Sequence, residues 1–585
     1  MAPHHPRSTP ARLTAPATAK LPRLYLLLLG IIYIFAGLFF REPWKTDDIV
    51  GLATMLTALN GPDQAAWLPQ IGSFAHAQDG PLAMWVGAAF ISVFTPIFTL
   101  FTQTLDAQII ASRLPNLLWF GLMVGAVWYA TYLLGRRPEP QPLRLPFGGE
   151  PTERDYGRMI ADASLLLILA TAGIMWRMHE TSEVPVIIAV QAVAFYSIVR
   201  MLDRPLSGAI TLGLAIGAAL LARGWIGALP IYLAIATAFL PTAALRARLK
   251  WVGLSVLIGT LLCLAWWIPA QSLNPYWAQY WWLWNIESFT FPSWREVFSI
   301  FRDLPWFLWP TWPFALMALW QWRSWLRAPH VWLPLMFALW PFITMLFLAD
   351  SFEPEYSLMA VPFAVMAAFA LPTLRRGMVN SLDWFAVMCF SLTIATVWLG
   401  WVALQAGWPE QISDNIARQT EGYDAYVSWP AVTIALAGTV AWLVLVRWRV
   451  LHRPAALWRG TVLSAGGIVT TWLLLVTLWM PALDYVRSYR DVSNSLSQAI
   501  ETHQRDNECV QAIDLGVGQR AAFYVFNGLD PTSNRNCALA IIQTSPQALD
   551  AGMHPLGNMN VTLLWEGKRR PERRELFQLV RIHAQ

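Results

Sequence analysis

Thirteen apolar runs, each of about 20 residues, constrain this chain more than any other feature of its sequence. A bilayer core about 30 Å thick requires about 20 apolar residues per helix, so a run of this length can cross a membrane. We therefore expect an all-α polytopic membrane protein. The runs cover residues 24–40, 114–134, 160–178, 184–200, 206–222, 225–243, 251–270, 304–322, 330–348, 356–374, 382–404, 429–447 and 460–480.

Composition excludes the other classes of protein. Of the 585 residues, 56% are hydrophobic and 13% are charged, against about 45–50% and about 25% in soluble domains, which excludes a soluble enzyme. The 34 Trp and 40 Pro exclude a simple coiled coil. The low charge content excludes a disordered or nucleic-acid-binding chain, so the net charge of +5 does not indicate DNA binding. Four Cys are too few for a general disulfide scaffold.

Loops rich in Lys and Arg alternate along the chain with loops that hold few, and cytoplasmic loops are the ones that collect positive charge. With the N-terminus inside, the inside segments hold 22 of the 41 basic residues, and only eight lie outside before residue 481. Residues 1–23 form an inside basic arm, expected to be disordered over the first 20. If the apolar segment 81–101 were a span, the basic loops that follow it would lie outside, so we expect this segment at the outer membrane interface. The alternative, that it is a true span and that the later helices have the inverted topology, stays open.

A small soluble domain, residues 481–585, follows the transmembrane region 24–480. Thirteen crossings place it outside the cytoplasm, in an oxidising compartment, where Cys509 and Cys537 are candidates for a disulfide. Cys263 and Cys389 lie in apolar runs and are expected to be packed thiols. Strand-like runs between polar turns predict an α/β fold, at residues 509–515, 521–526, 537–543 and 561–564.

Two acidic residues, Asp47 and Asp48, follow the first apolar run and precede a helix-like segment at 49–59. One interpretation is a helix N-terminus, where side-chain oxygens accept backbone N–H bonds and the carboxylates complement the dipole. The other is that these acids, in an outer loop at 41–113, act as a general base or bind a cation. Both interpretations stay open.

Two further polar features lie on the same side. His179, Glu180 and Glu183 occupy a very short loop, where ionisable groups next to hydrocarbon indicate function unless the loop is a solvated turn. Arg223-Gly224 separates two apolar runs, so Gly224 allows a turn there. Arg223 is either a fixed cation suited to phosphate or an arginine that snorkels to the interface.

The remaining sequence narrows the reaction class. The aromatic segment 266–287 is typical of a membrane-interface belt, and a minority of its rings are suited to stacking on sugars. The sequence contains no Walker loop, dinucleotide fingerprint, zinc pattern or Gly-x-Ser-x-Gly motif. The spans also lack the chain of ionisable residues that a proton-coupled transporter usually shows.

In their order along the chain, these motifs resemble the GT-C superfamily of integral-membrane glycosyltransferases, in the branch that contains protein O-mannosyltransferases and the lipid A aminoarabinose transferase. The resemblance covers residues 25–375. The matching boxes are the acidic pair at 44–48, the Pro-Leu box at 79–85, Arg-Leu-Pro at 113–115, the second acid Glu183, the basic-Gly turn at 223–224, Trp-Trp at 266–267, Asn-Pro at 274–275 and the helix start at 355–362.

The resemblance implies a GT-C fold of about 13 transmembrane helices. It implies transfer of a sugar from a polyprenyl-phosphate donor to a glycolipid, polysaccharide or protein, as in lipid A modification of the cell envelope. The site would lie at the outer face of a bacterial inner membrane, with a cytoplasmic N-terminus and a periplasmic C-terminal domain. The implied catalytic residues are Asp47 as the base, Asp48 and Glu183, with Arg223 binding the donor phosphate. The residues expected to line the substrate are Trp44, His76, Asp79, His179 and Tyr356.

The sequence departs from the family at two cations. Asp79 stands in place of the Lys of the Pro-Pro box, and Glu355 in place of a basic residue. Phosphate binding then rests on Arg223, with a divalent metal held by Asp47 and Asp79 as the one cofactor suggested. Two alternatives follow: a transporter or flippase of lipid-linked sugars, and a non-catalytic scaffold of the same fold.

Overall fold

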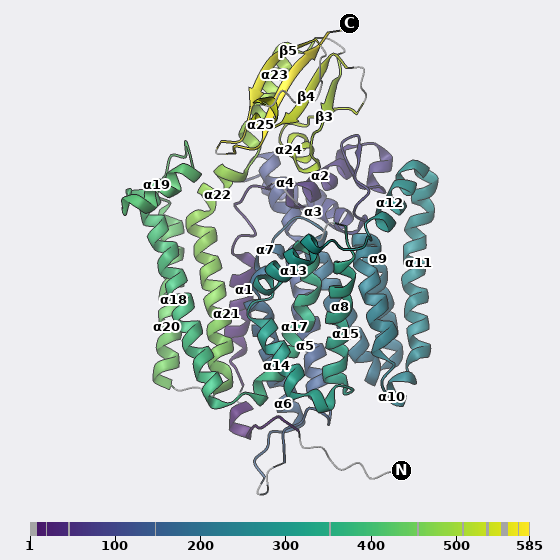
Figure 1. Ribbon diagram of the computed structural model, residues 1–585, viewed down its shortest axis with the longest axis vertical. Coiled ribbons are helices and arrows are strands. Elements are labelled where there is room, and N and C mark those ends of the chain that lie inside the picture. The colour runs from purple at the N-terminus through teal and green to yellow at the C-terminus, as the bar shows by residue number, and fades with distance from the viewer. Residues whose placement is uncertain are drawn as a thin grey trace.

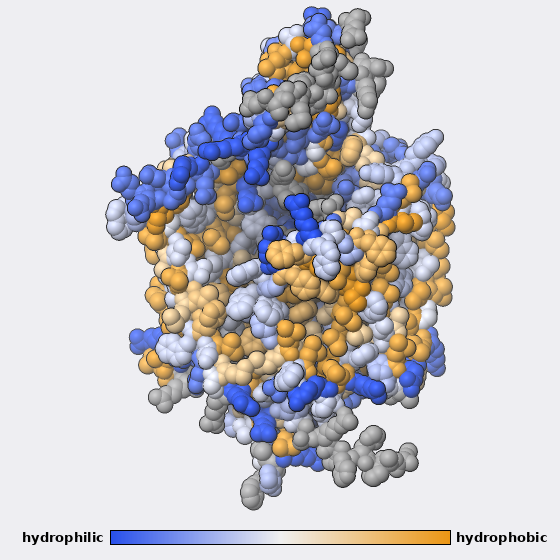
Figure 2. Space-filling view, viewed as in Figure 1, coloured by the Kyte–Doolittle hydropathy of each residue, from blue (hydrophilic) through white to orange (hydrophobic). Residues whose placement is uncertain are grey.

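The computed structural model is a bundle of long helices that carries a small α/β domain at one end (Figure 1). Polar side chains gather at the two ends of the bundle and apolar side chains cover the band between them (Figure 2), as in a multi-pass membrane protein. The structure describes residues 9–18, 20–44, 47–144, 146, 148–349, 353–452, 456–505, 508–533, 537–550, 560–570 and 572–583.

Nine helical segments within these residues are long and apolar enough to span a membrane. Most coincide with one helix or with two consecutive ones. They are Thr104–Gly135 (α4, Thr104–Arg113, and α5, Pro115–Gly135), Glu183–Asp203 (α8), Pro205–Ala238 (α9), Leu249–Leu273 (α11), Pro329–Leu346 (α15), Pro354–Thr373 (from α16, Glu353–Tyr356, to α17, Ala360–Ala370), Gly377–Ala406 (α18, Arg376–Ala406), Trp429–Leu451 (α20, Trp429–His452) and Trp458–His503 (from α21, Ala456–Leu474, through α22, Met480–Arg487, to α23, Arg490–His503).

The expected count of thirteen spans is not confirmed among the described residues, and four differences separate the two counts. Three expected spans are too short or broken: α1 (Arg23–Phe35) has 13 residues, residues 160–178 break between α6 (Glu153–Ala170) and α7 (Ala172–Arg177), and residues 304–322 break between α13 (Trp294–Phe307) and α14 (Thr311–Gln321). The fourth difference is that 206–222 and 225–243 are joined as α9.

The joined helix α9 nevertheless reverses direction at Arg223 and Gly224. Neither residue has helical backbone angles, and Gly224 has φ 55°, which a side chain disfavours. Arg248, beyond the end of α9, donates a hydrogen bond to the carbonyl of Leu202, just before its start, at 3.0 Å. A straight helix of 34 residues would separate these two points by about 50 Å. The turn anticipated at Arg223-Gly224 is therefore present.

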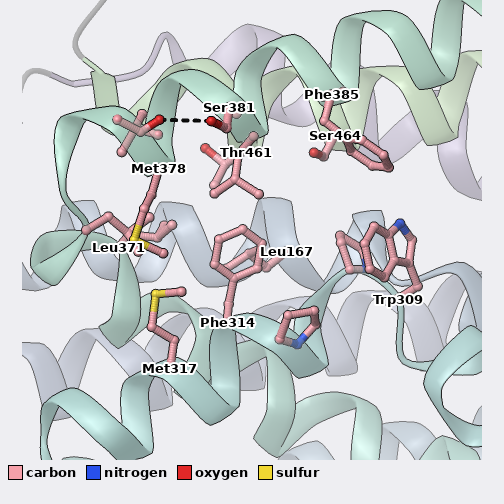
Figure 3. Close-up of a pocket in the computed structure, with 18 of the residues that line it drawn as sticks. Leu167, Trp309, Phe314, Met317, Leu371, Met378, Ser381, Phe385, Thr461 and Ser464 are labelled. Carbon is pink, nitrogen blue, oxygen red and sulfur yellow. Dashed lines mark hydrogen bonds between the residues drawn. The ribbon is translucent and has the colours of Figure 1, made fainter.

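Two packed bodies make up the bundle. The main core joins α5, α6, α8, α9, α15 and α17, and a second cluster joins α18, α20 and α21. An apolar cavity of about 480 Å³ lies where the two bodies meet (Figure 3). Trp309, Phe314 and Leu371 line one side of this cavity, with Phe385 and the hydroxyl of Ser381 facing them. The lining suits hydrocarbon and includes none of the acidic residues described below.

Short helices cap the end of the bundle that carries the C-terminal domain. Helix α2 (Asp47–Asn60) contacts α3 (Leu82–Phe98), which in turn contacts α4. Helix α3 has 17 residues and lies beside α2 and α4 at this end of the bundle (Figure 1), where it also contacts α5, α8 and α9. The first turn of α2 carries Asp47 and Asp48, so these two acids lie between the bundle and the domain.

The C-terminal domain contains a four-stranded sheet in the order β3-β4-β6-β5. β3 and β4 are parallel, the other pairs are antiparallel, and α23 (Arg490–His503) precedes the sheet. The strands are β3 Val510–Ile513, β4 Leu539–Thr544, β5 Val561–Gly567 and β6 Leu576–Ile582. The disulfide between Cys509 and Cys537 is confirmed.

Two sequence expectations fail here. Residues 521–526 belong to helix α24 (Val517–Asn527), because Ala521, Ala522 and Val525 share one buried face at helical spacing and Gly528, with φ 66°, ends the helix. Strand β6 was not predicted.

At the opposite end of the bundle, the N-terminal arm is ordered over residues 9–18, where disorder was expected. The backbone N–H of Arg12 donates to the carbonyl of Pro372, and that of Ala15 donates to the carbonyl of Gly149.

Candidate active site

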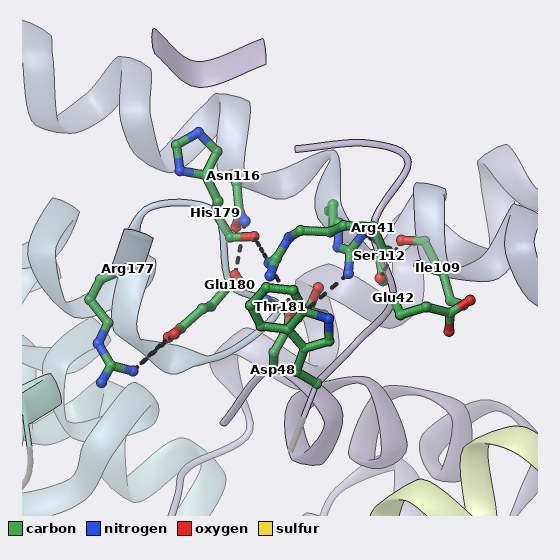
Figure 4. A network of polar contacts seen from close by, with 12 residues as sticks. Arg41, Glu42, Asp48, Ile109, Ser112, Asn116, Arg177, His179, Glu180 and Thr181 are labelled. Atoms are coloured by element: carbon green, nitrogen blue, oxygen red, sulfur yellow. Dashed lines mark hydrogen bonds and ion pairs between the residues drawn. The ribbon is translucent and has the colours of Figure 1, made fainter. Parts of the chain in front are cut away.

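Asp48 is enclosed in a network of polar contacts (Figure 4). Its side chain is 2% exposed, accepts the N–H of Thr181 at 2.7 Å, and lies 3.2 Å from Arg41 and 3.5 Å from Arg113. Burial opposes its ionisation, but the two arginines and the Thr181 N–H outweigh burial and hold the pKa of Asp48 below its usual value. Asp48 is therefore held as a buried, paired carboxylate, and its expected catalytic role stays a prediction.

The same network ties three distant segments together. Arg113 donates to the carbonyl of Arg41 at 2.6 Å, and Arg41 donates to the carbonyl of His179 at 2.8 Å. Asn116, in the first turn of α5, donates to the carbonyl of Glu180 at 2.9 Å (Figure 4). Because these donors bind main-chain oxygens, they fix the path of the 179–181 loop beside α2.

Asp47, the neighbour of Asp48, is the open acid of this region. Its side chain is 36% exposed and lies 3.4 Å from Arg177 at the end of α7. Arg177 also binds both oxygens of Glu180, at 2.9 and 3.0 Å. Desolvation raises the pKa of Asp47 despite the attraction of Arg223 and Arg177, and burial raises the pKa of Glu180 to about 8. Asp47 is thus an accessible carboxylate with a raised proton affinity.

A second cluster, which we call the Arg223 cluster, consists of Arg223, Asp79, Glu183 and Glu355. Arg223 lies 2.5 Å from Asp79, 3.1 Å from Glu183 and 3.0 Å from Glu355. His76 lies 3.1 Å from Asp79. Burial alone would raise the pKa of Asp79, but Arg223 and His76 lower it to about 2. The cluster thus brings together three sequence candidates, Asp79, Glu183 and Arg223.

Both departures from the family pattern meet at this one cation. Asp79 and Glu355, which stand where cations were expected, bind the two terminal nitrogens of Arg223. Three carboxylates thus surround a single guanidinium whose side chain is 10% exposed. In this state Arg223 is engaged with protein carboxylates at the positions through which it would bind a donor phosphate.

The expected substrate-lining residues are buried. Trp44, His76, His179 and Tyr356 are each at most 4% exposed, so packing encloses these side chains. The ring nitrogens of His179 lie 2.6 Å from the carbonyl oxygen of Met175 and 3.0 Å from that of Tyr33. These four side chains are packed into the site in this structure, and their expected role in lining the substrate stays a prediction. Asp79, the fifth, is 15% exposed.

The metal expectation finds no support in the arrangement of ligands. Among the described residues, no group of three or more His, Cys, Asp or Glu side chains is placed to hold a metal ion. Asp47 and Asp79 are each directed to an arginine, Arg177 and Arg223 respectively. These two acids do not form a ligand set, so no step below depends on a metal.

Sequence reasoning missed two kinds of residue. Arg41 and Arg177 are close in sequence to the acidic motifs, and this proximity could have indicated that they pair with the acids. Asp484 gave no signal, because it is 440 positions from Trp44, whose indole N–H it accepts at 2.7 Å.

The backbone defines this chain as a polytopic membrane protein with the GT-C fold. Among solved structures, it is similar to ArnT from Cupriavidus metallidurans bound to undecaprenyl phosphate, with TM-score 0.64 and 14% identity over 95% of this chain and 97% of that chain. The apo state of the same protein gives TM-score 0.62 and 15% identity over the same shares.

A second solved structure is less similar. An oligosaccharyltransferase of Archaeoglobus fulgidus, tethered with an acceptor peptide, matches with TM-score 0.44 and 12% identity over 88% of this chain and 64% of that one, and a TM-score this low does not establish a shared fold. No family model matches the sequence. No curated protein matches it either.

Proposed function

We propose that this protein is a glycosyltransferase that transfers a sugar from a polyprenyl-phosphate donor to an envelope acceptor at the outer face of the bacterial inner membrane. The observation that carries the proposal is the position of Asp47: an accessible carboxylate beside an arginine, at the start of α2, in a GT-C fold. The solved structure with the same fold holds undecaprenyl phosphate, which supports a lipid-linked donor.

Asp47 acts as the general base in this proposal. It takes the proton of the acceptor hydroxyl while that oxygen attacks the anomeric carbon, and the bond from this carbon to the phosphate oxygen breaks. Such proton transfer contributes typically 10²–10⁴-fold to a rate. The polyprenyl phosphate leaves with the electron pair of the broken bond. Glu183 is not placed to take this proton, because its carboxylate is buried against Arg223.

Arg223 binds the departing phosphate in this proposal, through an exchange of partners. The guanidinium releases a carboxylate of Asp79 or Glu355 and donates to phosphate oxygens instead, since both anions suit its planar fork. The exchange keeps the guanidinium paired throughout. Binding is then weaker than at a free arginine, because the phosphate competes with groups that are already in place.

The disulfide supports the proposed orientation. Disulfides persist in oxidising compartments, so the Cys509–Cys537 bond favours a periplasmic C-terminal domain. Helix α2, whose first turn carries Asp47 and Asp48, packs against this domain through its apolar residues and lies at the same end of the bundle. The chemistry would therefore take place on the periplasmic side, with the N-terminus cytoplasmic.

One observation favours a second function, a non-catalytic scaffold of the same fold. Three carboxylates hold Arg223, and this arrangement stabilises the fold without requiring a ligand. A scaffold would tolerate loss of the Asp47 carboxylate and would show no transfer.

Transfer of labelled sugar tests the proposal. Purified protein in membranes receives a panel of polyprenyl-phosphate sugars and extracted envelope acceptors, and Asp47→Asn is compared with wild type at equal folded amounts. The matched control is Asp63→Asn, an exposed acid of the same loop region. We expect transfer by wild type and control, and a loss of 10²–10⁴-fold in the variant. Undiminished transfer by Asp47→Asn would remove Asp47 as the base, and absence of transfer with every donor would favour the scaffold.

A further inference from the structure

Trp44 is held on several sides although it carries no reactive group. Its ring stacks on Trp176 with centroids 4.7 Å apart, and the guanidinium of Arg487 lies 5.3 Å from its centroid. The side chain is 4% exposed. Stacking and cation–π contacts of this kind stabilise one ring position over others. The backbone that leads into α2 is therefore anchored three positions before Asp47.

The residue that follows Trp176 forms an ion pair with Asp47. Arg177 follows Trp176 at the end of α7, and its guanidinium lies 3.4 Å from the Asp47 carboxylate. Two consecutive residues of α7 thus contact this segment: Trp176 stacks on Trp44, and Arg177 pairs with Asp47. Movement of Trp44 relative to Trp176 would change the distance between Asp47 and Arg177.

Asp484 binds the segment that precedes α2. One oxygen, Oδ1, accepts the indole N–H of Trp44 at 2.7 Å and the backbone N–H of Glu42 at 3.2 Å. Asp484 lies in α22, which continues the helical segment of the last candidate span. The final membrane helix is thus connected to the first outer loop by two hydrogen bonds from a single atom.

We infer that Asp484 is a positioning residue for Asp47, acting through Trp44. This inference rests on the proposed role of Asp47 as the base. Asp484 does not contact Asp47, and both of its hydrogen bonds hold the segment 42–44. Its function is to keep that segment against α7, so that Asp47 stays within reach of both Arg177 and the acceptor hydroxyl.

Three variants separate positioning from mere stability. Asp484→Ala removes the acceptor, Trp44→Phe removes the donor and keeps a ring, and Asp484→Asn retains an oxygen at Oδ1 for both bonds. Asp491→Ala, an exposed acid in the first turn of α23, is the matched control. Each variant is purified full length and accepted only if its thermal unfolding midpoint and its monodispersity match those of wild type.

The first readout is kinetic. We expect Asp484→Ala and Trp44→Phe each to lower kcat by about 10- to 100-fold, as expected for a displaced catalytic group, with little change in KM. The double variant should be no slower than Asp484→Ala, because the hydrogen bond that Trp44→Phe removes is already lost in Asp484→Ala. Asp484→Asn and Asp491→Ala should retain wild-type rates. Wild-type kcat in Asp484→Ala or Trp44→Phe, or multiplied losses in the double variant, would overturn the inference.

The second readout does not depend on activity. Hydrogen exchange of the amides in residues 41–50 should accelerate in Asp484→Ala and Trp44→Phe and remain at the wild-type rate in Asp484→Asn. Unchanged exchange would overturn the inference even if the protein transfers no sugar. If Asp484→Ala fails to fold, the comparison of Trp44→Phe with Asp484→Asn decides the same question. An inactive wild type would overturn the proposed function, whereas the exchange measurement would still test the positioning role.

Discussion

The guanidinium of Arg223 donates to the carboxylate of Glu355 at 3.0 Å, although 132 positions separate the two residues in the chain. The same guanidinium binds Asp79 and Glu183, so three acids converge on one cation at the reversal of α9. Each acid that binds Arg223 competes with an anionic ligand. In the proposed function, these carboxylates would compete with the donor phosphate for Arg223.

Asp79→Asn should strengthen phosphate binding. The substitution removes a negative charge next to Arg223, and a charge-assisted hydrogen bond contributes about 1.5–3 kcal/mol, so we expect affinity for a polyprenyl phosphate to rise about 10- to 150-fold. Titration of the lipid phosphate, followed by tryptophan fluorescence, measures the change. Asp63→Asn is the control for a charge change away from the cluster. Equal affinity in Asp79→Asn and wild type would contradict the partner exchange at Arg223.

Arg177→Gln should move the acidic limb of the pH–rate profile to higher pH. Desolvation raises the pKa of Asp47, so wild-type kcat/KM should fall as pH decreases through that raised value and the base becomes protonated. Arg177 opposes this shift by attraction; without it the pKa rises further and activity is lost at a higher pH. Initial rates from pH 4 to 9 show the limb directly. A limb that stays in place would argue against Asp47 as the titrating group.

Asp48→Asn should destabilise the fold, in contrast to Asp47→Asn. The substitution leaves Arg41 and Arg113 buried without their carboxylate, and breaking a buried pair in this way costs about 3–5 kcal/mol. Since the folded-state pKa of Asp48 is lowered, its stabilising contribution is complete above its unfolded pKa of about 4 and is lost as pH falls further. Thermal unfolding in detergent between pH 3 and 7 should show this loss in wild type and not in Asp48→Asn.

Reduction of the disulfide should loosen the C-terminal domain alone. The bond between Cys509 and Cys537 closes a loop of 28 residues, and a cross-link of this size stabilises by about 3–4 kcal/mol in the chain-entropy model. Cys509→Ser should therefore accelerate hydrogen exchange in β3 and β4 and leave α8 and α9 unchanged. Cys263→Ser, in a candidate span, is the matched control. Equal exchange of β3 and β4 in both variants would show that the bond does not constrain the domain.

Sequence patterns predicted the features that depend on local composition. Apolar runs indicated the spanning helices, Gly224 indicated the reversal of α9, and Cys509 was correctly matched to Cys537. Local patterns failed where tertiary packing decided the outcome. Residues 521–526 have high strand propensity and yet form α24, because one face packs against α2 and α23.

The sequence alone determined that this chain crosses a membrane many times, because no other common fold accommodates so many apolar runs of this length. Only the tertiary structure decided the chemistry of each acid. Asp47 and Asp48 are adjacent, but successive residues of a helix point about 100° apart, so Asp47 is partly exposed beside Arg177 and Asp48 is buried against Arg41 and Arg113. Likewise, the partners of Arg223 and the bond from Asp484 to Trp44 join segments far apart in the chain, and such contacts exist only once the helices have packed.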